Sequence, residues 1–233
     1  MRKASDALEL CPALYCRVMT YRLGKQRAYN RVVHPQTDIT IEGFPRCANS
    51  FAVQAFRSAN DVNEPLRIAT HLHSTANVVQ SIRLKIPTVV LIRNPRNALV
   101  SWLSLAIQLN KISETSRTDH NQLRRMTYWT KRYASFYERL MSYRPAMVCL
   151  DFNEVVTDYG ACIERINQRF STEFYLFRHT EARVEEVFKR SKVHLSPSVE
   201  REQIKEEIKE LYASKANSAN RERAQSAYNL FLS

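Results

Sequence analysis

Two short segments about 50 residues apart carry the residue types best suited to chemistry in this chain. The first is a loop that follows the alternating apolar run 38–42 and contains Arg46, and the second follows the apolar run 87–92 and begins at Arg93. A buried strand that ends in a tight turn and opens into a helix points successive backbone N–H groups at one place. The helix dipole adds positive potential there. Both segments therefore predict binding of a phosphorylated ligand.

The first loop has the spacing of the phosphate-binding loop of nucleoside triphosphatases, with two replacements. After Gly43, Ala48 stands where that loop has its second glycine, and Asn49 stands where it has its lysine. The hydroxyl of Ser50 is kept. A loop that keeps this spacing but carries its cation at Arg46, with a second basic strand exit downstream, indicates a different phosphorylated donor.

Apolar periodicity predicts the elements that would position these segments. Strands are expected at 38–43, 67–70, 87–92 and 146–150, and helices at 5–20, 49–59, 75–85, 97–109, 119–142, 153–170 and 181–191. A last helix is expected after Ser196 as its cap, and residues 214–224 are expected to form a loop or the start of a final helix. Alternating strands and helices indicate an α/β fold, with a mainly parallel central sheet of about four to five strands covered by helices on both faces. Ligands of such sheets lie at the carboxyl ends of the strands, where both segments fall.

Length and composition predict one domain with a well-buried core. We expect a basic N-terminal helical segment at 1–36, a nucleotide-binding core at 37–155 and a helical C-terminal part at 156–233 of this 233-residue chain. No apolar run approaches the roughly 18–20 residues that span a bilayer, and no secretory signal is evident. Five cysteines without CxxC spacing indicate reduced thiols and no zinc site. These features predict a cytoplasmic protein.

The net charge of +12 is partly local, because residues 1–34 carry seven Lys/Arg against two acidic residues. Such a balance fits nucleic acid, an anionic membrane face or a highly anionic small ligand. Interleaved tyrosines would suit nucleic acid, but no motif of that class accompanies them, and we expect no nucleic-acid partner: Tyr15, Tyr21 and Tyr29. The alternative is a solvated basic helix whose apolar side docks on the core: Leu10, Leu14, Val18 and Tyr21. A peripheral membrane contact through this basic segment stays open.

Four segments between residues 38 and 155, about half of the chain, together resemble the sulfotransferases that use 3′-phosphoadenosine 5′-phosphosulfate (PAPS). The family's Y-P-K-S-G-T-T-W loop, K-T-H-L segment, R-x-P-x-D-x-x-x-S segment and Y-E-D-L strand end are matched at 44–51, 69–72, 93–101 and 152–155. The resemblance implies the sulfotransferase fold, which is similar to that of P-loop nucleoside triphosphatases. It also implies transfer of a sulfuryl group from PAPS to a hydroxyl or amine, without a metal.

The resemblance implies that the loop grips the 5′-phosphosulfate through these residues: Arg46, Cys47, Ala48, Asn49, Ser50 and Phe51. Arg46 stands where the family usually has lysine, and its cation would stabilise negative charge that builds on the transferring group. Alanine in place of glycine is expected to confine position 48 to ordinary backbone angles.

Farther along the chain, the resemblance assigns Arg93 and Ser101 to the 3′-phosphate and places Phe152 near the adenine. Asn97 replaces the family's aspartate, and the family's basic C-terminal segment is missing. Arg221 and Arg223 are candidates to substitute for that segment.

His71 is the candidate general base, because an unperturbed histidine pKa of about 6.5 suits removal of a hydroxyl proton near neutral pH. Other branches of the family use a glutamate in the first helix, where this chain has Gln54, which cannot take a proton. His73 is the nearest competitor, because residues two apart on a strand share a face. The family's lysine before this segment is replaced by Ala69.

Two other functions stay open. A P-loop kinase or nucleoside triphosphatase would need the loop lysine and an acidic Mg²⁺ ligand, for which Asp151 is the remaining candidate, although it would equally serve as a helix cap. A basic module without catalytic activity would bind nucleic acid or membrane. For an enzyme, the acceptor could be a small molecule, a carbohydrate or a lipid.

Overall fold

The computed structural model describes residues 7–61, 65–109, 119–190 and 199–233. The chain divides into two compact units, and each is described by itself. The first unit comprises Met1–Ile92 and Leu140–Ser191, and the second comprises Arg93–Arg139 and Lys192–Ser233.

A parallel sheet of four strands forms the centre of the first unit. In spatial order the strands are β2 (Ile68–Thr70), β1 (Ile39–Gly43), β3 (Thr88–Ile92) and β4 (Val148–Asp151). Gly43 pairs with Leu91, and Ile92 pairs with Asp151, so the carboxyl ends of these strands meet at one edge. Every residue of β1 and β3 is buried, as expected for parallel strands with both faces covered. The predicted α/β fold with a mainly parallel sheet is confirmed.

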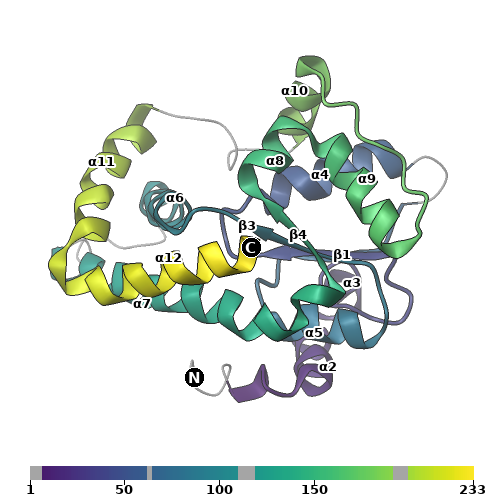
Figure 1. The fold of residues 1–233 in the computed structure, drawn as a ribbon, viewed down its shortest axis with the longest axis horizontal. Helices are drawn as coiled ribbons and strands as arrows, with labels where there is room; N and C mark the ends of the chain where they lie inside the picture. The colour runs from purple at the N-terminus through teal and green to yellow at the C-terminus, as the bar shows by residue number, and fades with distance from the viewer. Residues whose placement is uncertain (1–6, 62–64, 110–118, 191–198) are drawn as a thin grey trace. The chain divides into compact units, whose positions relative to one another are not determined.

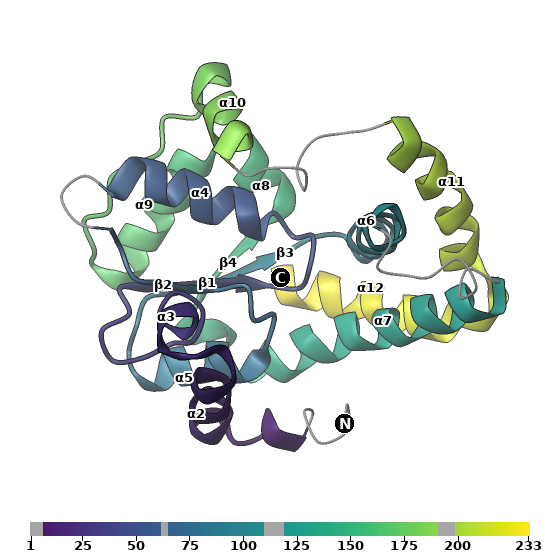
Figure 2. The ribbon, with the colours of Figure 1, turned by 180° about the vertical axis from the view of Figure 1, so that it is seen from behind.

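Helices cover both faces of this sheet (Figures 1 and 2). On one side lie α4 (Asn49–Asn60), α8 (Phe152–Thr157), α9 (Tyr159–Phe170) and α10 (Glu181–Arg190), and on the other lie α2 (Pro12–Leu23), α3 (Lys25–Ala28) and α5 (Thr75–Arg83). A 3₁₀ helix, η2 (Met141–Ala146), leads into β4. The single helix predicted at 153–170 is instead two, because Asp158 interrupts it and caps α9 by accepting a hydrogen bond from the backbone N–H of Ala161.

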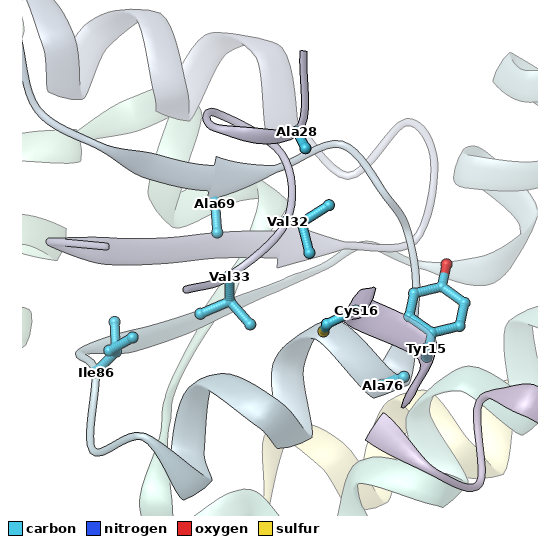
Figure 3. Packing of buried hydrophobic residues seen from close by; sticks show 8 residues of the cluster. All are labelled: Tyr15, Cys16, Ala28, Val32, Val33, Ala69, Ala76 and Ile86. Carbon is cyan, nitrogen blue, oxygen red and sulfur yellow. The ribbon is translucent and has the colours of Figure 1, made fainter. Parts of the chain in front are cut away.

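The N-terminal helix turns a different face to the core than the sequence pattern predicts. Leu10, Leu14 and Tyr21 are 75%, 48% and 90% exposed, whereas Tyr15 and Cys16 are buried. These two side chains pack in the cluster of Figure 3 with Ala28, Val32, Val33, Ala69, Ala76 and Ile86. The helix has two apolar stripes of similar strength, so local periodicity could not select the buried one. The prediction that Leu10, Leu14, Val18 and Tyr21 dock together on the core is wrong.

The second unit is helical. Its elements are α6 (Pro95–Gln108), α7 (Asp119–Leu140), α11 (Val199–Ala213), the 3₁₀ helix η4 (Lys215–Asn217) and α12 (Ser218–Leu232). Asn94 starts α6 by accepting hydrogen bonds from the backbone N–H groups of Arg96 and Asn97, and Pro95 fixes the first turn. Both α11 and α12 pack on α6, which explains why most of its apolar side chains are buried. The expected cap at Ser196 lies outside the described residues.

Candidate active site

The loop between β1 and α4 has a tight, partly left-handed backbone. Gly43 ends β1 at a point where a Cβ atom would lie 2.5 Å from the carbonyl oxygen of Leu91, so a side chain there would collide with backbone. Arg46 and Ala48 have φ angles of 71° and 67°. The prediction that Ala48 keeps ordinary backbone angles is wrong: closing the loop between a fixed strand and a fixed helix outweighs the roughly 1–2 kcal/mol cost of the left-handed conformation.

The start of α4 offers backbone N–H groups to an anion. Its cap residue is Ala48, and among the described residues no side chain caps this helix end. The first N–H groups of a helix have no intrahelical acceptor, and the helix dipole favours negative charge beside them. The start of α4 therefore has the backbone geometry that suits a bound anion.

Two residues of the loop, Asn49 and Cys47, brace it from within. Asn49 is 4% exposed, and its Nδ2 donates to the carbonyl oxygen of Phe44 at 2.9 Å. Cys47 is fully buried, and its backbone N–H donates to the same carbonyl at 3.3 Å. The residue at the position of the P-loop lysine thus serves the shape of the loop.

His71 joins the loop to the exit of β2. The strand ends at Thr70, and the chain then turns through His71, which has a φ of 59°. Its Nε2 lies 3.1 Å from the Oγ of Ser50 in the first turn of α4, and its Nδ1 lies 3.0 Å from the Oγ1 of Thr70. The structure thus brings together two residues from separate predicted motifs, His71 and Ser50.

His73 has a different environment from His71. Since β2 ends at Thr70, the two histidines do not share a strand face, and that part of the prediction is wrong. The Nδ1–H of His73 donates to the carbonyl oxygen of Gly43 at 2.7 Å, and burial lowers the pKa of His73. A neutral imidazole in this position ties the histidine turn to the end of β1.

A buried carboxylate, Glu42, holds the histidine turn in place. It accepts hydrogen bonds from the backbone N–H groups of Leu72 at 2.9 Å and His73 at 3.1 Å, and from the Nδ2 of Asn77 at 3.2 Å. Burial raises the pKa of Glu42 to about 7, even though these hydrogen bonds act to lower it. Sequence reasoning missed Glu42, although a carboxylate in an otherwise uncharged strand directly before the loop was an available signal.

The predicted contacts for the second phosphate, Arg93 and Ser101, belong to the second unit. Arg93 follows β3 directly along the chain, and its carbonyl oxygen accepts a hydrogen bond from the hydroxyl of Tyr133 at 2.6 Å. This bond fixes the backbone just before α6. Ser101 lies in the second turn of α6 and is 6% exposed, whereas Asn97, at the position of the family's aspartate, is exposed.

The two C-terminal arginines differ in their surroundings. The Nε of Arg223 lies 2.7 Å from a carboxylate oxygen of Glu138. The guanidinium carbon of Arg221 lies 5.9 Å from the ring centre of Tyr212, and among the described residues its buried Nε has no hydrogen-bond partner. Burial raises the pKa of Tyr212 to about 12, while the charges of Arg221 and Arg96 act to lower it, so both cations lie near this ring.

The aromatic candidates are placed as follows. Phe51 is 3% exposed, and its ring packs against those of Tyr159, Phe177, His179 and Phe188. This packing anchors the start of α4. Phe152 is the first residue of α8, directly after β4.

Asp151 is a helix cap. Its carboxylate accepts from the backbone N–H of Asn153 at 2.9 Å, and Glu154 accepts from the backbone N–H of Asp151 at 2.8 Å. This reciprocal capping uses the acidic residue that a P-loop kinase would need for Mg²⁺. In the ranges that the structure describes, no cluster of three His, Cys, Asp or Glu residues is arranged to hold a metal ion. Within the same ranges, none of the helices combines the length and apolar character that a bilayer crossing requires.

Comparison with known proteins gives a family match and a structural match. The sulfotransferase domain family matches residues 24–194, which is well over half of the chain. In structure, the chain is similar to the mouse sulfotransferase SULT7A1 complexed with PAP, with 10% sequence identity and a TM-score of 0.44 over 86% of this chain and 92% of that chain. Among curated proteins, none matches the sequence significantly. The family match includes the loop, the histidine turn and residues 93–101.

Proposed function

Because this chain belongs to the sulfotransferase domain family and is a sulfotransferase, we propose that it takes the sulfuryl group from PAPS and passes it to a hydroxyl or amine of an acceptor. The observation that carries the proposal is the contact between the Nε2 of His71 and the Oγ of Ser50, at 3.1 Å. This contact joins a histidine to the first turn of the helix that follows the phosphate-type loop. The candidate base is therefore in direct contact with the first turn of the helix proposed to hold the anion.

In this proposal the loop and the start of α4 hold the 5′-phosphosulfate. Sulfuryl transfer resembles phosphoryl transfer, in which the protein mainly supplies position and positive potential. Arg46 provides the cation, and the N–H groups that follow Ala48 provide fixed donors. Cys47, Ala48, Asn49 and Phe51 contribute through their backbone. The Asn49 side chain is bonded within the loop, the Cys47 side chain is buried, and the Phe51 ring packs against other aromatic rings.

The 3′-phosphate is assigned to Arg93 and Ser101. A guanidinium donates charge-assisted hydrogen bonds, and the hydroxyl from α6 adds a neutral donor. Of the two C-terminal arginines, Arg221 is the better third contact, because Arg223 is held by Glu138. We keep Phe152 as the aromatic residue proposed for the adenine.

The proposed proton path begins at His71. If Thr70 accepts the Nδ1–H, the Nε2 lone pair accepts the hydroxyl hydrogen of Ser50. Bound donor would turn that hydroxyl toward a phosphosulfate oxygen, which leaves Nε2 for the acceptor. The acceptor oxygen then forms a bond to sulfur as the bond from sulfur to the bridging phosphate oxygen breaks, the proton passes to Nε2, and adenosine 3′,5′-bisphosphate leaves.

Acceptors of three kinds are compatible with this site: small molecules, carbohydrates and lipids. The rival kinase function is disfavoured, because Asn49 is buried in the loop and Asp151 caps a helix. We treat residues 1–233 as one sulfotransferase domain.

Donor binding tests the proposal. The protein should bind adenosine 3′,5′-bisphosphate in the presence of a metal chelator, and far better than AMP. A charged hydrogen bond contributes roughly 1.5–3 kcal/mol, so Arg93→Ala should weaken bisphosphate binding by roughly 10- to 100-fold in calorimetry. Arg223→Ala is the matched control and should leave the affinity close to wild type. Equal affinity for AMP and the bisphosphate, or a strict need for Mg²⁺ with ATP as the preferred ligand, would contradict the donor assignment.

A further inference from the structure

Because α2 turns Tyr15 and Cys16 toward the core, the opposite side of the N-terminal segment is an exposed surface that is both apolar and basic. We call it the N-terminal face, and its members are Leu10, Leu14, Arg17, Tyr21, Arg22, Lys25, Arg27, Tyr29 and Arg31. All nine side chains are exposed. Four of them are large hydrophobic residues, with Tyr21 90% and Leu10 75% exposed. Figures 1 and 2 show the two helices that carry most of this face, α2 and α3, on the side of the sheet away from α4.

The charge of this face has one sign. Between Glu9 and Asp38 the sequence holds five Lys/Arg and no Asp or Glu. Glu9 is itself buried, and its carboxylate accepts a hydrogen bond from the hydroxyl of Thr75 at 3.1 Å. Asp38 pairs with Arg67 at 3.0 Å. The two acidic residues that border the stretch therefore have partners, and the stretch presents cations only.

A cavity of about 730 Å³ lies along the same face, between α2 and the end of α5. Its lining includes Ala13, Tyr21, Val33 and Leu84, together with the exposed cations Arg17 and Lys25. An apolar hollow next to cations suits a molecule with an apolar chain and an anionic head. Two members of the core cluster in Figure 3, Cys16 and Val33, also line this cavity, so the cavity lies directly against that core.

We propose that the N-terminal face binds an anionic lipid surface. Leucine and tyrosine side chains enter the boundary between head groups and acyl chains, while lysine and arginine side chains contact the anionic head groups. Each cation near such a surface strengthens binding roughly fivefold at moderate salt. Nucleic acid fits less well, because only Tyr21 and Tyr29 of this face offer an aromatic plane for a base, whereas Leu10 and Leu14 do not and Tyr15 is buried.

This inference stands apart from the proposed enzymatic function. It uses none of the residues assigned to the donor or to proton transfer, and its test needs neither donor nor acceptor. A protein that binds vesicles but transfers no sulfuryl group would refute only the proposed function. A protein with the opposite behaviour would refute only this inference.

Vesicle co-sedimentation of the full chain provides the test. Phosphatidylcholine vesicles that contain phosphatidylserine should bind the protein at least roughly tenfold better than pure phosphatidylcholine vesicles, and added salt should weaken that binding. Arg17→Glu with Lys25→Glu should reduce binding to the anionic vesicles by roughly 25-fold or more, from fivefold per cation. Leu14→Asp should reduce it by roughly tenfold, because it removes an inserted side chain and adds repulsion.

Leu176→Asp is the matched control, since Leu176 is 51% exposed, close to the 48% of Leu14, and lies outside the N-terminal face. It should bind like wild type. All substituted side chains are exposed, and circular dichroism and thermal melting verify that each variant is folded. Absent or equal binding to the two vesicle types would overturn the proposal, as would wild-type binding by Leu14→Asp. Binding of a single-stranded RNA oligonucleotide, lost in the charge variant, without vesicle binding would assign the face to nucleic acid instead.

Discussion

At the scale of single residues, the neighbours of His71 limit what its ring can do. Both ring nitrogens lie next to hydroxyls, Nδ1 at 3.0 Å from Thr70 and Nε2 at 3.1 Å from Ser50. A hydroxyl can donate or accept, so the proposed binding of the donor at Ser50 would change which atom offers a proton to Nε2. His73 lacks this freedom, because a carbonyl oxygen only accepts and thereby fixes its Nδ1 as a donor.

His71→Ala should lower kcat by roughly 10²–10⁴-fold, the usual loss for a general base, while the affinity for adenosine 3′,5′-bisphosphate stays close to wild type. The wild-type rate should rise with pH through a single ionisation, and this dependence should vanish in the variant. Steady-state kinetics across pH and bisphosphate titrations provide the two readouts. Near-full turnover of His71→Ala, combined with loss of turnover in a folded His73→Ala, would move the base to His73.

Arg46→Ala should lower turnover more than it lowers affinity for the bisphosphate, because that product lacks the sulfuryl oxygens on which charge builds in the transition state. Arg46→Lys should keep measurable activity, since it retains the cation but not the planar fork. The measurement is kcat for both variants beside the calorimetric Kd for the bisphosphate. A fully active Arg46→Ala enzyme would place the catalytic cation elsewhere.

At the scale of elements, the site is a junction of two strained turns at the carboxyl edge of a rigid parallel sheet. Four non-glycine residues with positive φ lie in these turns: Arg46, Ala48, His71 and His73. Such conformations persist only where the surroundings hold them, and here the buried strands and the carboxylate of Glu42 do so. The strained backbone therefore depends on elements that are themselves fully buried.

Ala48→Gly should keep or raise the free energy of unfolding, because it relieves a left-handed cost of roughly 1–2 kcal/mol that exceeds the roughly 0.4–1 kcal/mol entropy penalty of glycine. Ala52→Gly, one turn later inside α4, is the control and should lose roughly 1 kcal/mol or more. Urea denaturation of the two variants measures the difference. Equal destabilisation by both substitutions would show that the loop is not strained at Ala48.

At the scale of the whole molecule, the buried carboxylate of Glu42 links global stability to pH. Since its pKa in the folded chain is about 7, above the ordinary value of 4.5, the native state binds more protons than the unfolded state between these values. Its contribution to stability is therefore complete below that window and decreases as pH rises through it, by on the order of 2–4 kcal/mol.

Glu42→Gln should remove this part of the pH dependence. The free energy of unfolding, measured in urea at about pH 5 and about pH 8, should fall more with rising pH in the wild type than in the variant. The variant should also be less stable at both values, because its amide nitrogen cannot accept the hydrogen bond from the backbone of the histidine turn. Parallel pH profiles for the two proteins would show that Glu42 titrates alike in the folded and unfolded states.

Much of this protein follows from its sequence. The order of strands and helices can be predicted from the local spacing of apolar residues. A helix with one buried stripe and a strand buried on both faces each have a characteristic pattern of apolar residues. The edge of the sheet that carries the motifs follows from the parallel connections, since each predicted motif begins where a strand ends. The order and spacing of residues in the loop and in 93–101 were also enough to indicate the family of enzymes to which the chain belongs.

Only the tertiary structure decided the features that depend on contacts between distant residues. The buried face of α2 was chosen by packing against α5, because its two apolar stripes are alike in sequence. Ala48 took left-handed angles because the strand and helix on either side are fixed, and neighbouring residues do not encode that constraint. Glu42 became the support of the histidine turn through bonds to backbone 30 and 31 positions away. Local sequence sets which elements form, whereas the roles of these residues arise from long-range packing and hydrogen bonding that exist only once the sheet is assembled.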